Sequence, residues 1–510
     1  MISTIHFFFI VYLGFDRNYG LQPATYVLTL LSDNMTDKPR EMDTQSFRKH
    51  AHELVDWMAD YFESVEDYPV MSQVKPGDIL KQIPTKAPNQ PESFDQMLKD
   101  FNDIIMPGIT HWESPNFMAY FPANKSKGSV LAEMLMSTLG AQCMQWLTSP
   151  AAAELEEQMM NWLREMLGLP ESFTGVIQDT ASTATLCALL TAREKATNYS
   201  INEKGFDERK FTIYSSEQIH SSIDKAVKIA GFGIEALRKV EVDDGYAMIP
   251  EKLEELIEAD KAAGYIPLCV VSAIGTTSTT AVDPIDEIGD ICLKHNIWHH
   301  VDAAYAGTAL VLPEMRWMSE GVEKADSFVF NPHKWMFTNF DCTAYFVKDP
   351  VSLVNTFTIS PDYLKTSVDG EVKNYRDWGI PLGRRFRALK LWFVIREFGV
   401  EGIQEKIRKH IMLGKWLAQE IDAHSDFELM APVPMNTVCF RYTKGEESQL
   451  DGLNEAIMNK INNSGKLFFT QTKLKGRFVL RLAFGNTNLE AFHVENAWQL
   501  IQETASEIKP

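Results

Sequence analysis

The feature that most constrains the fold is an alternation of strand-like and helix-like segments between about residues 150 and 350. The short segments are continuously apolar, as in strands buried on both faces, and the longer segments between them have helical spacing. Chains of this kind form a mainly parallel sheet with helices on both faces, so the sequence predicts an α/β fold. The predicted strands are 175–178, 211–214, 268–274, 297–301, 328–330 and 343–347, and a helix is predicted at 186–196.

A smaller α/β domain is predicted after this sheet. A helix over 382–398 leads away from it, and two further apolar strands follow at 437–442 and 478–484. Helical patterns separate these strands, and a last helix is predicted over 490–508.

The N-terminal part contains one clear amphipathic helix. Apolar residues recur at helical spacing between Phe47 and Phe62, and Asp43 or a neighbouring hydroxyl residue precedes them as a candidate cap. Residues 1–34 include an apolar run that is too short to span a bilayer, and no Lys or Arg precedes it. We expect 1–34 to be a disordered extension or spurious upstream translation, with a membrane anchor as the alternative.

The composition excludes some function classes. A net charge of -20 argues against a nucleic-acid partner, which would require a basic face. The six cysteines are scattered, with no CxxC pair, and most lie in apolar segments. Disulfides and a metal site are therefore not expected, and we expect a chain of the reducing cytoplasm.

The most informative short segment is 328–335. Three apolar residues suit a buried strand, Asn331-Pro332 stops it, and Lys334 follows beside Trp335. A lysine in an apolar setting has a lowered pKa, and the neutral amine can attack an aldehyde to form a Schiff base. Taken alone, a lysine at this position is far more often an ordinary surface lysine on a loop.

The sequence Asn331-Pro332-His333-Lys334-Trp335 resembles the cofactor-lysine motif of group II pyridoxal phosphate (PLP) decarboxylases, in particular aromatic-L-amino-acid decarboxylases. The resemblance extends from about residue 43 to residue 508. Three more motifs carry it: 111–122, which begins His-Trp and ends Tyr-Phe-Pro, 300–307, which reads His-Val-Asp-Ala-Ala-Tyr-Ala-Gly, and 381–387, which reads Pro-Leu-Gly-Arg-Arg-Phe-Arg.

This resemblance implies PLP fold type I and a homodimer with an extensive interface. The expected sheet is seven-stranded and mainly parallel. The expected domains are a dimerisation segment at 35–125, a PLP-binding domain at 126–408 and a small domain at 409–510. The resemblance implies a soluble enzyme with PLP as cofactor, an amino acid as substrate and no membrane or nucleic-acid partner.

Small and hydroxylic residues at the start of a predicted helix suit a phosphate, because free N–H groups and the helix dipole face it. Thr180, Ala181 and Ser182 have this position. The resemblance adds further cofactor contacts: Asn331, His333 and Gly383 near the phosphate, Thr277 near the ring, and Ala304. Asp179 stands where the family usually has Gly, which leaves the shape of the phosphate site open.

Four residues are expected to perform the chemistry. Lys334 holds the cofactor, and Asp302, at the end of a predicted strand, bonds the pyridine nitrogen and keeps it protonated. By resemblance, His220 lies against the ring near the substrate carboxylate, and Tyr363, on a predicted mobile loop, returns a proton to the substrate. Without the resemblance, Asp302 fits a turn residue and His220 a structural histidine.

An aromatic wall is expected to hold the substrate side chain. Aromatic residues between prolines are more often core, but their match to the family's substrate-side segment favours a pocket. Besides His220, the expected substrate contacts are Trp112, Tyr120, Phe121, Pro122, Ala123, Gln142 and Met144.

The predicted activity is decarboxylation of an aromatic L-amino acid of the tryptophan, tyrosine, phenylalanine or dihydroxyphenylalanine type. Ala123, Gln142 and Met144 depart from the common pattern, so a different side chain remains an alternative. A second alternative is an aldehyde synthase, although such relatives commonly replace the residue at the position of Tyr363 or His220, and both are present here. A third is a PLP-binding protein without activity.

Overall fold

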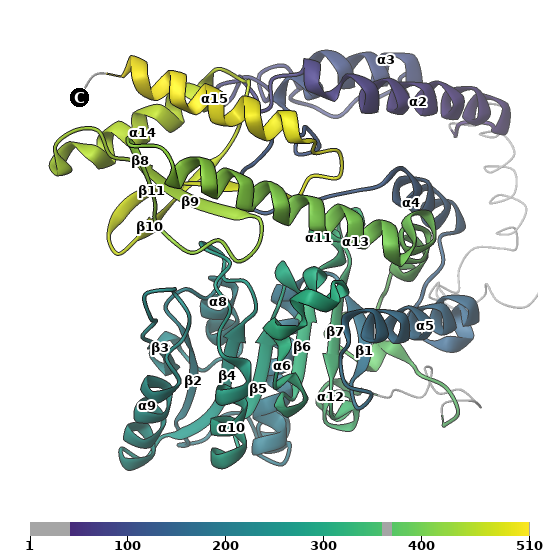
Figure 1. The fold of residues 1–510 in the computed structure, drawn as a ribbon. Coiled ribbons are helices and arrows are strands. Elements are labelled where there is room, and N and C mark those ends of the chain that lie inside the picture. Colours follow the sequence, from purple (N-terminus) through teal and green to yellow (C-terminus); the bar gives the residue numbers. More distant parts are fainter. Residues whose placement is uncertain (1–40, 360–369, 509–510) are drawn as a thin grey trace, which may run out of the picture. The chain divides into compact units, whose positions relative to one another are not determined.

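The computed structural model describes residues 41–359 and 370–508 (Figure 1). These residues form two units. The smaller unit holds the described residues up to 63 together with 80–104, and the larger unit holds 64–79 and the described residues from 105 onwards. Tyr363 and residues 1–34 lie outside the described residues, so the structure does not bear on the predictions made for them.

The smaller unit is built on two helices, α2 (Thr44–Ser64) and α3 (Phe94–Asp100). Asp43 caps α2, because its Oδ1 accepts the backbone N–H of Ser46 at 3.0 Å. The predicted amphipathic helix and its cap are therefore confirmed.

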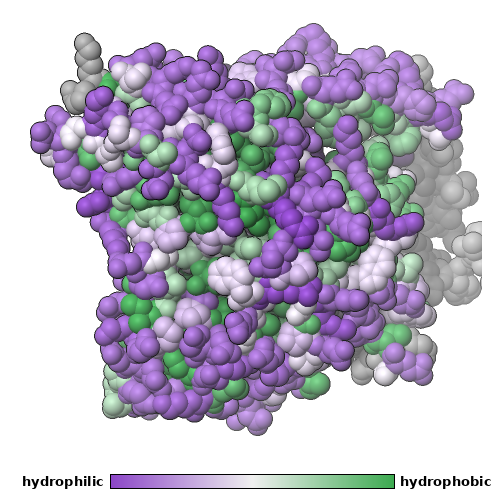
Figure 2. Space-filling view, in the orientation of Figure 1, coloured by the Kyte–Doolittle hydropathy of each residue, from purple (hydrophilic) through white to green (hydrophobic). Residues whose placement is uncertain are grey.

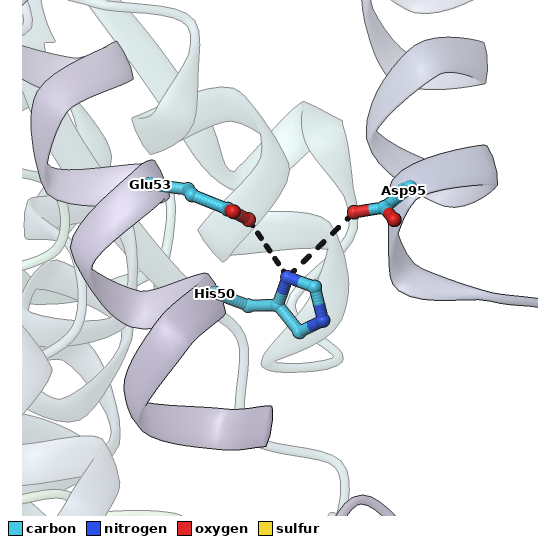
Figure 3. A group of neighbouring side chains, drawn as sticks. All are labelled: His50, Glu53 and Asp95. Atoms are coloured by element: carbon cyan, nitrogen blue, oxygen red, sulfur yellow. Dashed lines mark hydrogen bonds and ion pairs between the residues drawn. The ribbon is translucent and has the colours of Figure 1, made fainter. Parts of the chain in front are cut away.

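His50 joins these two helices (Figure 3). Its Nδ1 lies 2.8 Å from Oε2 of Glu53 on α2 and 3.8 Å from Oδ1 of Asp95 on α3. The His50 ring also packs on Phe94, with centroids 4.5 Å apart. The two carboxylates thus have a hydrogen-bonded and packed histidine between them, which explains the cluster as a helix-to-helix contact.

The larger unit contains a seven-stranded sheet in the order β1-β7-β6-β5-β4-β2-β3. The neighbouring pairs among β3, β2, β4, β5 and β6 are parallel, and β7 is antiparallel to both β1 and β6. The predicted mainly parallel sheet is confirmed. Its strands are β1 (Thr174–Gln178), β2 (Phe211–Ser216), β3 (Leu237–Val240), β4 (Ile266–Ala273), β5 (Trp298–Asp302), β6 (Ser327–Phe330) and β7 (Thr343–Val347).

Helices cover both faces of this sheet, because its strands alternate apolar side chains between two cores. In β4, Cys269 and Val271 pack with α6 (Ala181–Ala196) and α8 (Ser222–Ile229), whereas Val270 packs with α9 (Pro250–Ala262) and α10 (Ile285–His295). The other helices around the sheet are α4 (Lys127–Leu139), α5 (Pro150–Leu167), α7 (Ser200–Lys204), α11 (Pro332–Trp335) and α12 (Pro350–Phe357).

A second, antiparallel sheet follows in the order β10-β11-β9-β8. The C-terminal helices α14 (Glu447–Asn463) and α15 (Ala491–Glu507) pack on it, as the shared core of this region shows. The strands are β8 (Phe427–Leu429), β9 (Thr437–Tyr442), β10 (Thr470–Leu474) and β11 (Arg477–Ala483).

The long helix α13 (Arg387–Asp422) connects the two sheets (Figure 1). Gly399 interrupts it with φ 65°, a value that suits glycine. The predicted start at 382 is wrong by five residues, because Arg384 lies in a non-helical segment that is fixed by side-chain bonds to Gln142 and Glu156. The expected domain boundary at 408/409 falls inside α13.

Short helical turns connect the longer elements. In chain order they are η1 (Val65–Asp67), η2 (Phe101–Ile105), η3 (Met106–Gly108), η4 (Trp146–Thr148), η5 (Ile234–Ala236), η6 (Ala306–Val311), η7 (Pro313–Ser319), η8 (Val322–Lys324) and η10 (Tyr375–Asp377).

Hydrophilic residues cover much of the face drawn in Figure 2, and hydrophobic residues gather in a band between the regions of the two sheets. All six cysteines are buried and unpaired. Within the described residues, no helix combines the length and apolarity that a membrane crossing requires.

Candidate active site

A cavity of about 560 Å³ lies at the carboxyl ends of β4, β5 and β6, where residues of the small sheet also reach it. Ligands commonly bind at this edge of open α/β sheets. Thirteen of the predicted site residues line this one cavity: Trp112, Tyr120, Phe121, Thr180, Ala181, Ser182, His220, Thr277, Asp302, Ala304, Asn331, His333 and Lys334.

Lys334 lies on α11, directly after β6, so the strand end points it into the cavity. Its backbone is held at both ends: its N–H donates to Asn331 at 3.0 Å, and its carbonyl accepts the Asn124 side chain at 2.7 Å. Burial lowers the pKa of the Lys334 amine, although the charge of Asp302 opposes this shift. A lowered pKa increases the fraction of neutral, nucleophilic amine at neutral pH.

Asp302 is the last residue of β5 and is only 7% exposed. Its Oδ1 accepts the backbone N–H of Ala304 at 3.0 Å, which fixes the carboxylate at the cavity wall. This position suits a carboxylate that bonds a protonated ring nitrogen.

His220 lies in the turn between β2 and α8. Its Nδ1 accepts the backbone N–H of Ser222 at 3.1 Å and lies 2.8 Å from the Ser222 hydroxyl. An amide N–H can only donate, so Nδ1 carries no proton and the neutral ring carries its proton on Nε2. Burial lowers the pKa of His220; Asp302 raises it and Lys334 lowers it further. The ring is therefore mainly neutral near pH 7.

The first turn of α6 faces the same cavity. Thr180 is its cap, with Oγ1 accepting the N–H of Thr183 at 3.3 Å. Ala181 and Ser182 lie in the first turn, where no helical carbonyl can accept their N–H groups, so these groups suit an anion. Their place in the cavity fits a phosphate.

Asp179 lines a separate hollow rather than the Lys334 cavity. Its Oδ1 accepts the N–H of Thr180 at 2.6 Å, and its neighbours in the hollow include Arg385 and Arg387. Asp179 thus lies in a hollow that arginines also line, while Ala181 and Ser182 line the Lys334 cavity and keep their N–H groups for a phosphate.

Asn331 and His333 stand at the base of the cavity with structural bonds of their own. Asn331 Oδ1 accepts the Thr343 hydroxyl at 2.8 Å, and His333 Nδ1 accepts the N–H of Cys342 at 2.9 Å. Burial and the nearby Lys334 lower the pKa of His333 to about 3, so its ring is neutral.

The aromatic wall is a stacked column. The Phe121 ring lies 3.8 Å from the Tyr305 ring, and Tyr305 stacks on Trp335 at 4.8 Å. Trp335 in turn donates its indole N–H to His410 at 2.9 Å. Trp112 and Tyr120 form a second stack at 5.7 Å and are partly exposed.

Five predicted site residues do not line this cavity: Pro122, Ala123, Gln142, Met144 and Gly383. Pro122 packs on Gly485, and Ala123 follows it in the chain. Gln142 lies against Gly383 and accepts the N–H of Arg384, and the Met144 carbonyl accepts the N–H of Arg376. The segment after α4 therefore packs on 376–384, away from Lys334 within one chain.

Several lining residues were not expected from the sequence: Gly275, Ser278, Tyr305, Phe340, Thr470, Gln471, Thr472 and Arg481. Four of them lie on strands β10 and β11 of the small domain, whereas Gly275 and Ser278 lie close to the predicted Thr277. Two of them carried a signal in the sequence: Tyr305 lies inside the 300–307 motif, and Arg481 is a charged residue inside the apolar stretch 478–484.

The Pyridoxal-dependent decarboxylase conserved domain matches residues 76–443. Phenylacetaldehyde synthase of Arabidopsis thaliana is 44% identical, with 92% of this chain and 97% of that protein covered. Aromatic-L-amino-acid decarboxylase of Sus scrofa is 44% identical, with 92% and 98% covered. Among solved structures, Catharanthus roseus tryptophan decarboxylase in complex with L-tryptophan has a TM-score of 0.87 and 39% identity, with 92% of this chain and 100% of that one covered.

Proposed function

Because the chain belongs to the pyridoxal-dependent decarboxylase family, we propose that it removes the carboxyl group of an aromatic L-amino acid and releases the arylalkylamine and carbon dioxide. The observation that carries this proposal is the convergence of Lys334, Asp302 and His220 on one cavity. The first turn of α6 opens into the same cavity and supplies the phosphate site.

The residues fit the cofactor. Lys334 would hold its aldehyde carbon, Asp302 its pyridine nitrogen, and the N–H groups of Ala181 and Ser182 its phosphate. When bound, PLP supplies an electron sink for the bond to the carboxyl group.

Three side chains of the protein have separate roles in the reaction. Asp302 keeps a proton on the ring nitrogen. His220 offers its Nε2 proton from the cavity wall, and we assign it to the substrate carboxylate. Tyr363 is assigned the return of a proton to the substrate carbon, the role that the resemblance gives it.

An aromatic side chain fits the wall of the cavity. Trp112, Tyr120 and Phe121 provide flat apolar surface, whereas Ser278 and Thr472 add hydroxyl groups, which are bonded to each other at 2.9 Å. Such a combination suits a ring that carries a polar atom, such as an indole or a phenol.

The rival activity is that of an aldehyde synthase, because one relative at 44% identity bears the name phenylacetaldehyde synthase. Tyr363 and His220 are both present here, which favours the amine as product. A decarboxylase of another side chain is the second rival.

We further infer that the enzyme is a homodimer. Leu131, Leu135 and Leu139 form an exposed apolar stripe on α4, at 52%, 47% and 64% exposure. A stripe of this kind is typical of an interface. Gln142 and Met144 follow α4 directly, so a second copy bound to this stripe would bring these two residues towards the cavity of that second copy.

We also propose the cytoplasm as location, because six unpaired buried thiols suit a reducing compartment.

The test is incubation of the PLP-loaded protein with all common amino acids and dihydroxyphenylalanine, with amines and aldehydes identified by mass spectrometry. An arylalkylamine as the main product supports the proposal. Aldehyde with peroxide indicates the synthase, an amine from an aliphatic or acidic amino acid refutes the aromatic assignment, and absence of any product refutes the activity.

A further inference from the structure

Arg481 is a buried cation at the wall of the cavity, and no acidic side chain among the described residues pairs with it. It lies on β11 and is 4% exposed. Its three nitrogens donate to backbone carbonyls: Nε to Ser278 at 3.0 Å, one terminal nitrogen to Tyr120 at 2.7 Å and the other to Thr277 at 2.9 Å. Among the ion pairs of the described residues, none involves Arg481, and backbone carbonyls do not neutralise its positive charge.

The same guanidinium packs on the aromatic wall. Its Cζ lies over the Phe121 ring, 4.7 Å from the centroid. Tyr305 stacks on Phe121 at 3.8 Å, so the Phe121 ring contacts both the phenol and the guanidinium.

The bond to Tyr120 also has a conformational role. Tyr120 has φ 51°, in the left-handed region, which is strained for a residue other than glycine. Both the carbonyl of Tyr120 and the ring of Phe121 are held by Arg481, so one side chain offsets this strain.

We propose that Arg481 is the positioning residue of this cavity: it fixes the Tyr120–Phe121 segment against the Thr277–Ser278 turn and presents an uncompensated positive charge to Lys334. The inference rests on the proposed function. Lys334 Nζ lies 5.6 Å from the same Phe121 ring, which places both cations around one aromatic group. In agreement, the pKa of Lys334 is lowered first by burial and also by Arg481, against the opposing effect of Asp302.

The test separates charge from geometry with two substitutions. Arg481→Met removes both, whereas Arg481→Lys keeps a charge but cannot reach three carbonyls in a plane. Arg477→Met is the matched control, because Arg477 lies on the same strand and is exposed. For each holoenzyme, the visible absorbance of the cofactor–lysine linkage is titrated with pH, and kcat and KM are measured separately.

With Arg481→Met, the titration midpoint should rise by about one pH unit, because a nearby positive charge no longer opposes protonation. With Arg481→Lys, the titration midpoint should stay near the wild-type value. KM should rise about tenfold, because the Tyr120–Phe121 segment is no longer held in place. Arg477→Met should change neither.

If the midpoint is unshifted in a folded Arg481→Met protein, the charge of Arg481 does not act on Lys334. If KM is unchanged in Arg481→Lys, Arg481 does not position the Tyr120–Phe121 segment. If Arg481→Met does not fold, the proposal is tested with Arg481→Lys and Phe121→Leu. Both substitutions should raise KM without moving the titration midpoint. Unchanged KM values in both variants refute the proposal. A wild-type protein without the visible band would instead refute the proposed function.

Discussion

Arg384 donates from both terminal nitrogens to the two carboxylate oxygens of Glu156, at 3.0 and 2.6 Å, and the pair is almost completely buried. Glu156 lies on α5, and its Oε1 also accepts the N–H of Ile177 in β1. Arg384 donates further to the Ile177 carbonyl at 2.6 Å. This single pair therefore joins the segment before α13 to the first strand of the large sheet.

Removing one partner of this pair should be strongly destabilising, because the other charge stays buried without compensation. Glu156→Gln should lower the free energy of unfolding by about 3–5 kcal/mol. The matched control is Glu314→Gln, which breaks the exposed pair with Arg408 and should cost less than about 1 kcal/mol. Urea unfolding of the three proteins measures both values, and equal costs would contradict the assigned role of the buried pair.

Buried neutral histidines predict a loss of stability in mild acid. Burial lowers the pKa of His410 to about 3, far below its value of about 6.5 in an unfolded chain. The unfolded state therefore binds the proton first, and stability is lost as the pH falls below about 6.5. At pH 5 this residue should cost roughly 2 kcal/mol relative to pH 7.5.

His410→Gln tests this prediction, because glutamine keeps an acceptor for the Trp335 indole N–H but does not titrate. The difference in unfolding free energy between pH 7.5 and pH 5 should be smaller in the variant by about that amount. An identical pH dependence in both proteins would show that His410 does not contribute.

Asp302→Asn tests the carboxylate at the ring nitrogen. Asparagine keeps an oxygen for the N–H of Ala304, so the strand end should keep its conformation. Loss of the charge should lower kcat about a hundredfold or more, with bound PLP still detectable by absorbance. Turnover within a fewfold of wild type would assign Asp302 a structural role only.

Much of the fold follows from local patterns that a sequence displays directly. All six predicted strands of the large sheet are present, because each is a continuous apolar run that both faces of the sheet bury. β3, β8 and β10 were missed, and β3 and β10 hold more polar residues because they lie at sheet edges. The start of α13 was misplaced because a buried ion pair, which a sequence does not show, holds 384 out of the helix.

The site was predictable where motif and strand end coincide, as at Asp302 and Lys334. Arg481 enters the cavity only through tertiary packing, because it lies on a strand of the small sheet far from the recognised motifs. The opposite case is Gln142, which sequence resemblance assigned to the substrate but which packs near Gly383 in a single chain.

Tyr363→Phe tests which product the enzyme forms. The substitution removes the phenolic proton but keeps the ring. Amine formation should fall about a hundredfold or more, while aldehyde and peroxide rise in the presence of oxygen. The measurement is the amine-to-aldehyde ratio with and without oxygen. Amine at the wild-type rate without peroxide would mean that another group supplies the proton.

The most direct measurement is reductive trapping of the cofactor with borohydride, followed by peptide mapping. The chain offers a chemically reasonable competitor, because burial lowers the pKa of Lys390 to about 8. Lys390, however, is paired with Glu133 at 3.1 Å and does not line the cavity. We predict a pyridoxyl label on Lys334 alone, and its loss in Lys334→Ala but not in Lys390→Met. A label on Lys390 or any other lysine of wild-type protein would contradict the assignment of this cavity as the active site.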